Sequence, residues 1–340
     1  MRLLLLGLLL LAGCAHREVY QQQRYIFGTL VEVSVYGDDR AKATAAIDRV
    51  MQRFGELHRK FHAWALSEIT SLNDAFASGR AMRIDPEAAF LIRESTLISD
   101  RSGGLFDPAI GGLIALWGFQ GDEFRPVRPA PGKIAALVAQ HPEMDDISIR
   151  GDVAMSKNPA VKLDLGGIAK GYALDVAAGI LKASGVSDAL VNIGGNILAL
   201  GRRGDRPWHV GIRDPRGSGA IAELDLQDGE AIGTSGDYQR YFMLNGLRYC
   251  HIIDPRTGYP VQGVRAVTVL IPKGKDAGLL SDAASKPLFV SGVAGWRAAA
   301  RETGVDEAML IDASGGLHVT RKLSARLHFE PSAPRPEIVP

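Results

Sequence analysis

The segment LDLGGIAKGYALD, residues 163–175, is the most informative stretch of this 340-residue sequence. A strand end supplies Asp164, and the two glycines that follow let the backbone approach a ligand closely. A helix is predicted over about 167–184, and its first turn offers unpaired N–H groups and a positive dipole to an anion. Lys170 lies in that turn, where the dipole disfavours a cation. The segment is therefore either a phosphate-binding turn that includes Lys170 or a glycine-rich turn with a solvated lysine. Its spacing fits neither a P-loop nor a Rossmann fingerprint.

The rest of the chain mixes strand patterns with helix patterns. Val31, Val33 and Val35 fall on one face of a half-buried strand near 25–37. Helices are predicted at about 41–61 and 86–102 and, as a pair, at 277–303, with strands near 188–201, 208–213, 221–226, 239–243, 248–253 and 265–272 and a hairpin near 307–320. Residues 120–160 are predicted to be loops with a short helix. Strict βαβ alternation is missing, so we predict an α+β fold of mixed, mostly antiparallel sheets with packed helices.

The composition is that of an ordinary globular protein, with 46% hydrophobic and 23% charged residues. The length suits one large domain or two smaller ones. Lys plus Arg (39) almost equals Asp plus Glu (38), and no basic stripe or tail is present. We therefore expect no nucleic-acid partner. Two cysteines cannot form a disulfide framework, and Cys250 is expected to be a structural thiol.

The N-terminus carries a leucine run that ends in Leu11-Ala12-Gly13-Cys14. The run is too short for a spanning helix and suits a signal-peptide core. Small residues directly before a cysteine resemble the bacterial lipobox, in which the cysteine is lipidated; the alternative is an ordinary secretory signal with a chance cysteine. We expect the body to lie on the periplasmic side of the cell envelope, lipid-anchored to the membrane through Cys14. The expected divisions are a lipoprotein signal peptide at 1–13, a lipidated N-terminus and tether at 14–24, one domain at 25–328 and a disordered tail at 329–340.

Two further segments carry polar residues next to turns. In TSGDYQRYF (234–242), Ser235 and the glycine after it form either a phosphate cradle or a tight turn. In YCHIIDPRTGYPV (249–261), DPRTG is a strong turn signal. His251 precedes it, as a general base, a ligand group or a structural histidine.

Aromatic residues stand beside small residues in FHAWALSEITSLND (61–74) and LFDPAIGGLIALWGF (105–119). They suit a flat ring ligand and equally a plain core. In SDAASKPLF (281–289), Asp282 is followed four residues later by Lys286. This spacing is typical of an ion pair on a helix, so on its own it does not indicate an active site.

Together these segments resemble the ApbE family, the FAD:protein FMN transferases, also known as thiamine-biosynthesis lipoproteins. The match runs from Phe27 to the strand near Val319, with the motifs FGT, W…SE…LN, FDPAIGGLIALWGF, DLGGIAKGYALD, NIGGN, TSGDY, HIIDPRTG and SDAASKPLF in family order. The resemblance implies binding of FAD and, with Mg²⁺, transfer of its FMN half to a Ser or Thr hydroxyl of an acceptor protein, with release of AMP. Catalysis would then rest on positioning and charge neutralisation.

The resemblance also implies roles for single residues. His251 and Asp254 would lie near the reacting phosphate, where either would take the proton of the acceptor. The metal would be held by the Gly167 carbonyl, Asp282 and Ser285. The FAD site would comprise Phe27 and Trp64 against the flavin, the backbone of Ala109, Ile110 and Gly111, and Asp164, Lys170, Ser235, His251 and Pro255.

One position departs from the family pattern in a way that matters. Lys286 stands where the family has a threonine that helps to bind the metal. A protonated ammonium cannot ligate Mg²⁺. It would either pair with Asp282 in place of the metal or contact the pyrophosphate as a point charge. Asn196 is a milder departure, since many members have Asp there.

Three functional hypotheses are consistent with the sequence. We favour a working FMN transferase, with Lys286 as a catalytic residue that replaces or supplements the metal. Its acceptor would carry a short Asp-Gly-x-x-x-Ser/Thr motif, as in membrane electron-transfer subunits. The alternative is a non-catalytic FAD-binding envelope lipoprotein, accessory to a redox complex. The third is hydrolysis of FAD to FMN and AMP.

Overall fold

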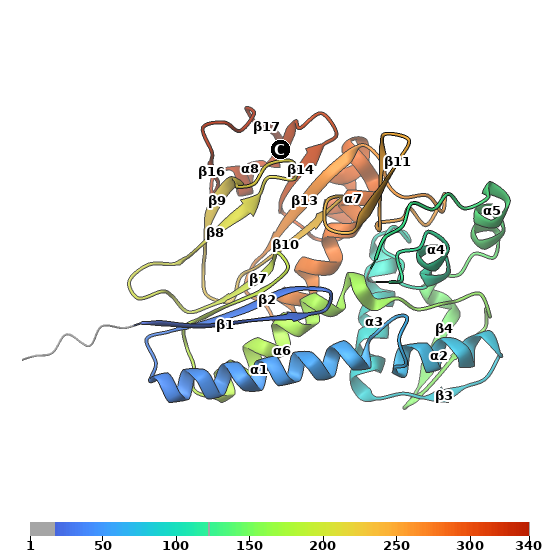
Figure 1. Ribbon diagram of the computed structural model, residues 1–340, viewed down its shortest axis with the longest axis horizontal. Coiled ribbons are helices and arrows are strands. Elements are labelled where there is room, and N and C mark those ends of the chain that lie inside the picture. The colour runs from blue at the N-terminus through green and yellow to red at the C-terminus, as the bar shows by residue number, and fades with distance from the viewer. Residues whose placement is uncertain (1–17, 122, 340) are drawn as a thin grey trace, which may run out of the picture.

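The fold is seen in a computed structural model that describes residues 18–121 and 123–339 (Figure 1). The helices are α1 (Arg40–Lys60), α2 (Glu68–Ala77), α3 (Pro86–Arg101), α4 (Gly111–Leu116), α5 (Pro131–Ala139), α6 (Ala169–Ala183), α7 (Ala277–Glu302) and α8 (Arg321–Ser324). The first strands are β1 (Val19–Ile26), β2 (Thr29–Tyr36), β3 (Met82–Arg83), β4 (Ile147–Arg150), β5 (Val153–Ser156), β6 (Ala189–Ile193), β7 (Asn196–Leu200), β8 (Trp208–Arg213) and β9 (Ala220–Leu226). The later ones are β10 (Ala231–Gly236), β11 (Tyr241–Leu244), β12 (Leu247–Cys250), β13 (Val264–Ile271), β14 (Glu307–Asp312), β15 (Leu317–Thr320), β16 (His328–Phe329) and β17 (Glu337–Val339).

A nine-stranded sheet in the order β1-β2-β6-β7-β10-β13-β14-β15-β17 forms the centre of the molecule. All its pairings are antiparallel except that of β15 with β17. Smaller sheets join β16, β9 and β8, and β3, β5 and β4, while β11 and β12 form a hairpin. The predicted α+β class with mostly antiparallel sheets is confirmed.

The central sheet is covered on both faces, and its strands alternate accordingly. In β13, Val267 and Val269 belong to the core cluster under the helices, where residues of α1, α6 and α7 also lie. Ala266 and Leu270, which flank this pair, belong to a second cluster with residues of β8 and β9. A period of two thus assigns successive side chains to two different layers.

A third apolar cluster packs α4 and α5 against the β11–β12 hairpin. The rings of Phe119 and Phe242 stack with centroids 5.4 Å apart. The Trp117 indole N–H donates to the carbonyl of Gly258 over 2.8 Å. This cluster fixes the DPRTG turn beside the aromatic segment 105–119, two parts of the chain that are distant in sequence.

Helix α7 passes between two glycines at very short range. A Cβ on Gly171 of α6 would lie 2.3 Å from the carbonyl oxygen of Gly278, and one on Gly233 of β10 would lie 2.1 Å from that of Ser281. On α6, Asp175 accepts hydrogen bonds from the backbone N–H groups of Gly278 (2.8 Å) and Leu279 (2.7 Å). The start of α7 is therefore fixed from both sides.

Two predictions about the ends of the domain are wrong. The expected tether at 14–24 contains most of β1, whose pairing with β2 begins at Val19. Its sequence is too polar for the alternation that marks a buried strand, because β1 is an edge strand. The tail at 329–340, expected to be disordered, forms the end of β16 and then β17, which pairs with β15 and buries Val339. The proline-rich composition of this segment gave no indication of β17, a short strand that covers the edge of the sheet.

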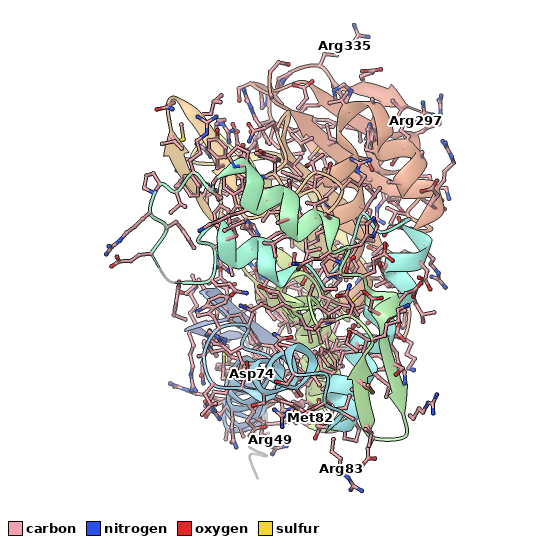
Figure 2. The ribbon with its side chains drawn as sticks, turned by 90° about the vertical axis from the view of Figure 1, so that its right-hand side faces the viewer. Arg49, Asp74, Met82, Arg83, Arg297 and Arg335 are labelled. Carbon is pink, nitrogen blue, oxygen red and sulfur yellow. The ribbon has the colours of Figure 1, made fainter. Side chains whose placement is uncertain are left out.

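Residues 120–160 also differ from the prediction, because they contain the β4–β5 hairpin as well as the expected helix, α5. Helix α2 was not predicted, although Ser67 and Thr70 form a capping box at its start. Cys14 and the expected signal peptide lie outside the described residues. Within the part of the chain that the structure describes, none of the helices combines the length and hydropathy of a membrane span. Figure 2 shows Arg83 and Met82 at one end of the molecule and Arg297 and Arg335 at the other.

The glycine contact between α6 and α7 yields a stability prediction. We expect Gly171→Ala to lower the free energy of unfolding by about 1–3 kcal/mol, because the added methyl group overlaps the backbone of α7. Gly179→Ala, on the exposed face of the same helix with no atom within 4 Å of the new Cβ, is the control. It should raise the free energy of unfolding by about 0.5–1 kcal/mol. Urea denaturation measures the free energy of unfolding of both variants. Equal changes in the two variants would contradict the close contact between α6 and α7 at Gly171.

Candidate active site

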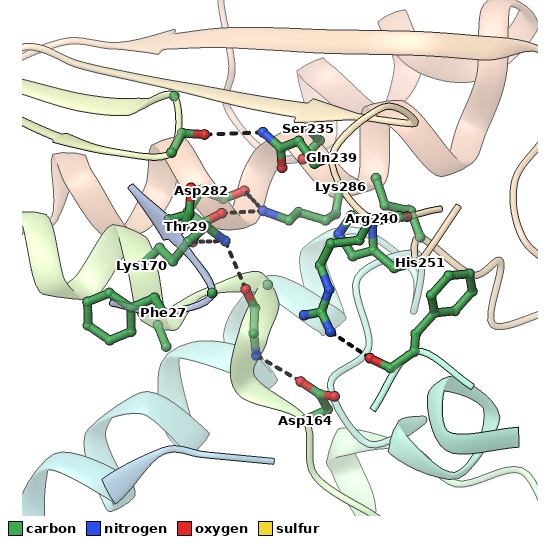
Figure 3. A pocket seen from close by; sticks show the side chains of 18 of the residues that line it. Phe27, Thr29, Asp164, Lys170, Ser235, Gln239, Arg240, His251, Asp282 and Lys286 are labelled. Carbon is green, nitrogen blue, oxygen red and sulfur yellow. Dashed lines mark hydrogen bonds and ion pairs between the residues drawn. The ribbon is translucent and has the colours of Figure 1, made fainter. Parts of the chain in front are cut away.

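A cavity of about 1120 Å³ opens beside the start of α7 (Figure 3). It is lined by the β1–β2 turn, the end of α1 and the loop after it, the segment 163–175, the ends of β6 and β10, and the turn after β12. Among the described lining residues, the charged side chains are Asp107, Asp164, Asp282, Lys170, Arg213, Arg240 and Lys286. Four cations against three carboxylates suit an anionic ligand.

Asp282 lies at the centre of the charged part of the cavity and is only 1% exposed. Its Oδ2 accepts the backbone N–H of Gly171 over 3.0 Å and lies 3.6 Å from the Lys170 Nζ. Its Oδ1 accepts from the ammonium of Lys286, which also donates to the backbone oxygen of Asp282 over 2.8 Å. Figure 3 shows these three side chains together. The i,i+4 pair is real, and it forms part of the cavity wall.

Burial and charge act in opposite directions on this cluster. Burial acts to raise the pKa of Asp282, but the charges of Lys170 and Lys286 outweigh it and the pKa is lowered. Burial lowers the pKa of Lys286 to about 8, against the stabilising charge of Asp282. At neutral pH both groups are therefore mainly charged, and the two lysines with the carboxylate carry a net positive charge.

The other face of the same turn of α7 is taken up by hydroxyl groups. Ser285 is fully buried, donates to the Asp282 backbone oxygen over 2.7 Å and lies 2.7 Å from the Ser235 hydroxyl. Ser235 lines the cavity, whereas Ser285 is not among the lining residues. Ser285 thus links α7 to β10, and its hydroxyl is already engaged within the protein.

The segment 163–175 reaches the cavity as the sequence predicts. The Asp164 carboxylate accepts the N–H of Gly166 over 3.0 Å and lies 3.4 Å from the Gln120 amide. Lys170 donates to the Gly166 carbonyl over 3.1 Å, so its ammonium faces the glycine turn and not bulk solvent. Gly167 lies between side chains: an added Cβ would be 3.2 Å from Phe106 and 3.6 Å from Lys286.

The aromatic rim of the cavity contains Phe27 and Trp64, which were both predicted to meet a flavin. Phe27 adopts a positive φ of 58° and packs against Phe54 and His58. Trp64 remains 37% exposed, and the Arg240 guanidinium lies 5.1 Å from the centre of its ring. A flat ring bound here would contact two aromatic side chains from different parts of the chain.

The turn after β12 brings some of its predicted residues to the cavity. His251 and Pro255 line it, and the His251 Nδ1 lies 3.3 Å from the carbonyl oxygen of Arg240. Burial, with the positive charges of Arg240, Lys170 and Lys286, lowers the pKa of His251 to about 3, so this imidazole is neutral at pH 7.

Asp254 is not among the lining residues; its carboxylate accepts two hydrogen bonds from the Arg256 guanidinium, at 2.9 and 2.8 Å, and one from the Arg256 backbone. The Asp254 carboxylate therefore stabilises the turn through its ion pair with Arg256, and its role near the reacting phosphate stays a prediction. Cys250 is buried, and burial raises the pKa of its thiol to about 12, as expected of a structural cysteine.

Of the three residues predicted to line the site through backbone, only Ile110 is a lining residue of the cavity. Gly111 donates its N–H to Lys162 over 2.7 Å, and Ala109 donates to the Asp107 carboxylate over 2.9 Å. Both hold Ile110 at the wall. Asp107 lines the cavity, and burial raises its pKa to about 7.

Arg240 is the main cavity residue that the sequence analysis missed. It donates to the Phe119 carbonyl over 2.6 Å, which ties the turn between β10 and β11 to the aromatic segment. An arginine in a polar turn is usually solvated, so the residue type gave no signal. The one available indication was its place two residues after the TSGDY motif.

The cavity therefore combines two features in one space. Its charged wall, with Lys170 and Lys286, is suited to the phosphates of a nucleotide. Its aromatic rim, with Phe27 and Trp64, is suited to a flat ring. A ligand that spans both has a ring system joined to a pyrophosphate or phosphate.

Comparison with known proteins agrees with this geometry. A family model described as "ApbE family" matches residues 27–310. A FAD:protein FMN transferase from Rhodobacter capsulatus is 44% identical over 89% of this chain, which spans 57% of that relative's length. A FAD:protein FMN transferase from Treponema pallidum is 31% identical over 94% of this chain and 93% of its own.

The fold has a close counterpart among solved structures. The crystal structure of the ApbE protein from Thermotoga maritima superposes with a TM-score of 0.83 at 31% identity, covering 91% of this chain and 99% of that one. This chain is therefore similar to ApbE proteins in both sequence and structure over almost all of the described residues. This chain belongs to the ApbE family.

Proposed function

We propose that this protein transfers the FMN moiety of FAD to a Ser or Thr hydroxyl of an acceptor protein, through a phosphoester bond, and releases AMP. The observation that carries the proposal is the joining of an aromatic rim and a cationic wall in one cavity, built by the family motifs. In this proposal the flavin ring binds against Phe27 and Trp64, and the pyrophosphate binds at the wall formed by Lys170 and Lys286.

The reaction breaks the phosphoanhydride bond of FAD and forms a phosphoester bond to the acceptor. The acceptor oxygen attacks the phosphorus of the FMN half and forms the new P–O bond. The bond from that phosphorus to the bridging oxygen breaks, and AMP leaves with the oxygen and its electron pair. The hydroxyl proton is released to solvent or to a nearby base. Negative charge grows on the leaving phosphate, where positive side chains stabilise it.

The chain's own residues supply positioning and charge for this reaction. Lys170 and Lys286 line the space assigned to the pyrophosphate, and Arg240 lines the cavity with its guanidinium beside the ring of Trp64. His251 is neutral with a low pKa, so it is a weak base and a good acceptor or donor of a hydrogen bond. Asp254 has no part in this assignment.

The family resemblance implies Mg²⁺, but the oxygen atoms of Asp282 and Ser285 are not suited to bind it. The Asp282 carboxylate and backbone oxygen accept hydrogen bonds from Lys286, Gly171 and Ser285, and the Ser285 hydroxyl is engaged as well. A hard divalent cation needs free oxygen ligands. No step of the proposed reaction is therefore assigned to a metal.

We also propose that the protein is anchored in the cell envelope through a lipidated Cys14 and acts on a periplasmic acceptor. The support is the short leucine run followed by Leu11-Ala12-Gly13-Cys14. Cys14→Ser should move the protein from the membrane fraction to the soluble fraction and abolish incorporation of labelled palmitate. Continued membrane association of an unlabelled variant would contradict the anchor.

The transfer itself is tested by mass spectrometry. The purified protein is mixed with FAD and an acceptor domain that carries the Asp-Gly-x-x-x-Ser/Thr motif. The acceptor should gain the mass of FMN less water, with an equimolar amount of AMP, and an acceptor with Ala at the hydroxyl position should gain nothing. If the protein binds FAD but the acceptor gains no mass, while a related transferase does modify the same acceptor, the accessory FAD-binding lipoprotein would be supported. Release of FMN and AMP without an adduct would support hydrolysis.

The pH dependence of transfer tests the assignment of His251. Its pKa is lowered to about 3, so the imidazole stays neutral as the pH falls through about 6.5, where an ordinary histidine would gain a proton. We expect the kcat/KM of transfer to show no inflection near that pH. An inflection there that is lost in His251→Asn would show a titrating base and contradict the assignment.

A further inference from the structure

The oxygen atoms at the start of α7 already accept hydrogen bonds from positively charged or backbone donors. Asp282 is 1% exposed, with Oδ1 and its backbone oxygen bonded to Lys286 and Oδ2 bonded to the N–H of Gly171. The Lys170 ammonium lies 3.6 Å from the same Oδ2. This arrangement offers donors to a ligand in the cavity and leaves few oxygens for a cation.

We propose that Lys286, together with Lys170, binds the pyrophosphate of FAD directly in place of a divalent metal, so that this chain binds and cleaves FAD without a metal ion. The inference rests on the proposed FMN transfer. It concerns the lysine at residue 286 of this chain, whose ammonium bonds to two atoms of Asp282.

The donor count of Lys286 supports a direct contact. An ammonium group has three N–H donors. Asp282 accepts at two of its atoms, Oδ1 and the backbone oxygen. The third donor remains for a phosphate oxygen, and Lys286 is a lining residue of the cavity. Its side chain is only 15% exposed and is already held at two atoms of Asp282, so little side-chain freedom is lost on binding.

Charge balance supports the same conclusion. Two ammonium groups and one carboxylate sum to one positive charge, which attracts a pyrophosphate. A divalent cation added here would lie within a few ångströms of two ammonium groups, and like charges in a buried site repel strongly. To bind the Oδ1 and the backbone oxygen of Asp282, it would also have to displace the Lys286 ammonium from both atoms.

The chemical role of Lys286 follows from the reaction. As the bond between the FMN phosphorus and the bridging oxygen breaks, the electron pair stays on the AMP phosphate. A hydrogen bond from the Lys286 ammonium to that phosphate becomes stronger as the charge grows. Lys286 keeps its proton throughout, and the hydroxyl proton leaves separately, so the step balances without a metal.

The first test needs no variant. FAD is titrated into the purified protein in EDTA and in MgCl₂, and binding is followed by the change in flavin fluorescence. We expect the same Kd in both buffers, and FMN transfer to the acceptor domain that continues in EDTA. An FAD affinity or a transfer rate that requires Mg²⁺ would overturn the inference.

The variants then assign the effect to residue 286. Lys286→Met should weaken FAD binding about 10- to 100-fold by loss of a charged hydrogen bond. It should slow transfer about 10²- to 10³-fold, with or without Mg²⁺. Lys286→Thr supplies an oxygen in place of the ammonium, so its binding and transfer should be weak in EDTA and should be restored by MgCl₂.

The control variant is Lys322→Thr, which removes a lysine paired with Asp306 on the surface, where the two side chains are 66% and 73% exposed. It should match the wild type in both buffers. Thermal unfolding of each variant separates a loss of folding from a loss of binding. Wild-type binding and transfer by Lys286→Met in EDTA would show that the lysine does not replace a metal.

The outcomes also separate this inference from the proposed function. In one outcome, FAD binding is insensitive to EDTA and is weakened by Lys286→Met, but no FMN adduct forms on an acceptor that a relative modifies. This outcome would support Lys286 as the pyrophosphate ligand and would reject the transferase function. An adduct that forms only with Mg²⁺ would retain the transferase and reject the metal-free site.

Discussion

The passage of α7 between Gly171 and Gly233 is the constraint on which the site depends. Neither position has room for a Cβ, so the backbone of α7 lies directly against α6 on one side and β10 on the other. This contact buries Asp282 and brings the Gly171 N–H within 3.0 Å of its carboxylate. A buried carboxylate needs partners of opposite charge. Lys170 and Lys286 provide them, and their ammonium groups thereby become fixed parts of the cavity wall.

The rest of the cavity is assembled by packing between distant segments. The central sheet brings β10 to α7, and the third apolar cluster brings the turn after β12 to the aromatic segment 105–119. Arg240 joins these parts by its bond to Phe119 and its contact with the ring of Trp64. Rigid elements thus hold an aromatic rim and a cationic wall in one space, which is the arrangement that a transfer reaction based on positioning requires.

Much of this could be predicted from the sequence, and the exceptions have physical reasons. The valines of β2 and the periodic helix α1 carry strong patterns, and the motifs placed Asp164, Lys170, Asp282 and Lys286 together. The polar edge strand β1 and the proline-rich strand β17 carry weak patterns, because a strand at a sheet edge needs little hydrophobic alternation. Asp254 was placed at the reacting phosphate by motif alone, but its partner is a neighbour in sequence, Arg256. Motif order identifies the neighbourhood of a site, whereas the direction of each side chain depends on packing.

The most direct measurement of the central claim is a crystal structure of the protein grown with FAD and MnCl₂, with anomalous data collected for manganese. Mn²⁺ takes the oxygen ligands that Mg²⁺ prefers, and its position is visible even at partial occupancy. The account predicts the Lys286 ammonium between Asp282 and a phosphate oxygen of FAD, with no manganese bonded to Asp282. A manganese ion bonded to Asp282, with the Lys286 side chain turned away, would contradict it.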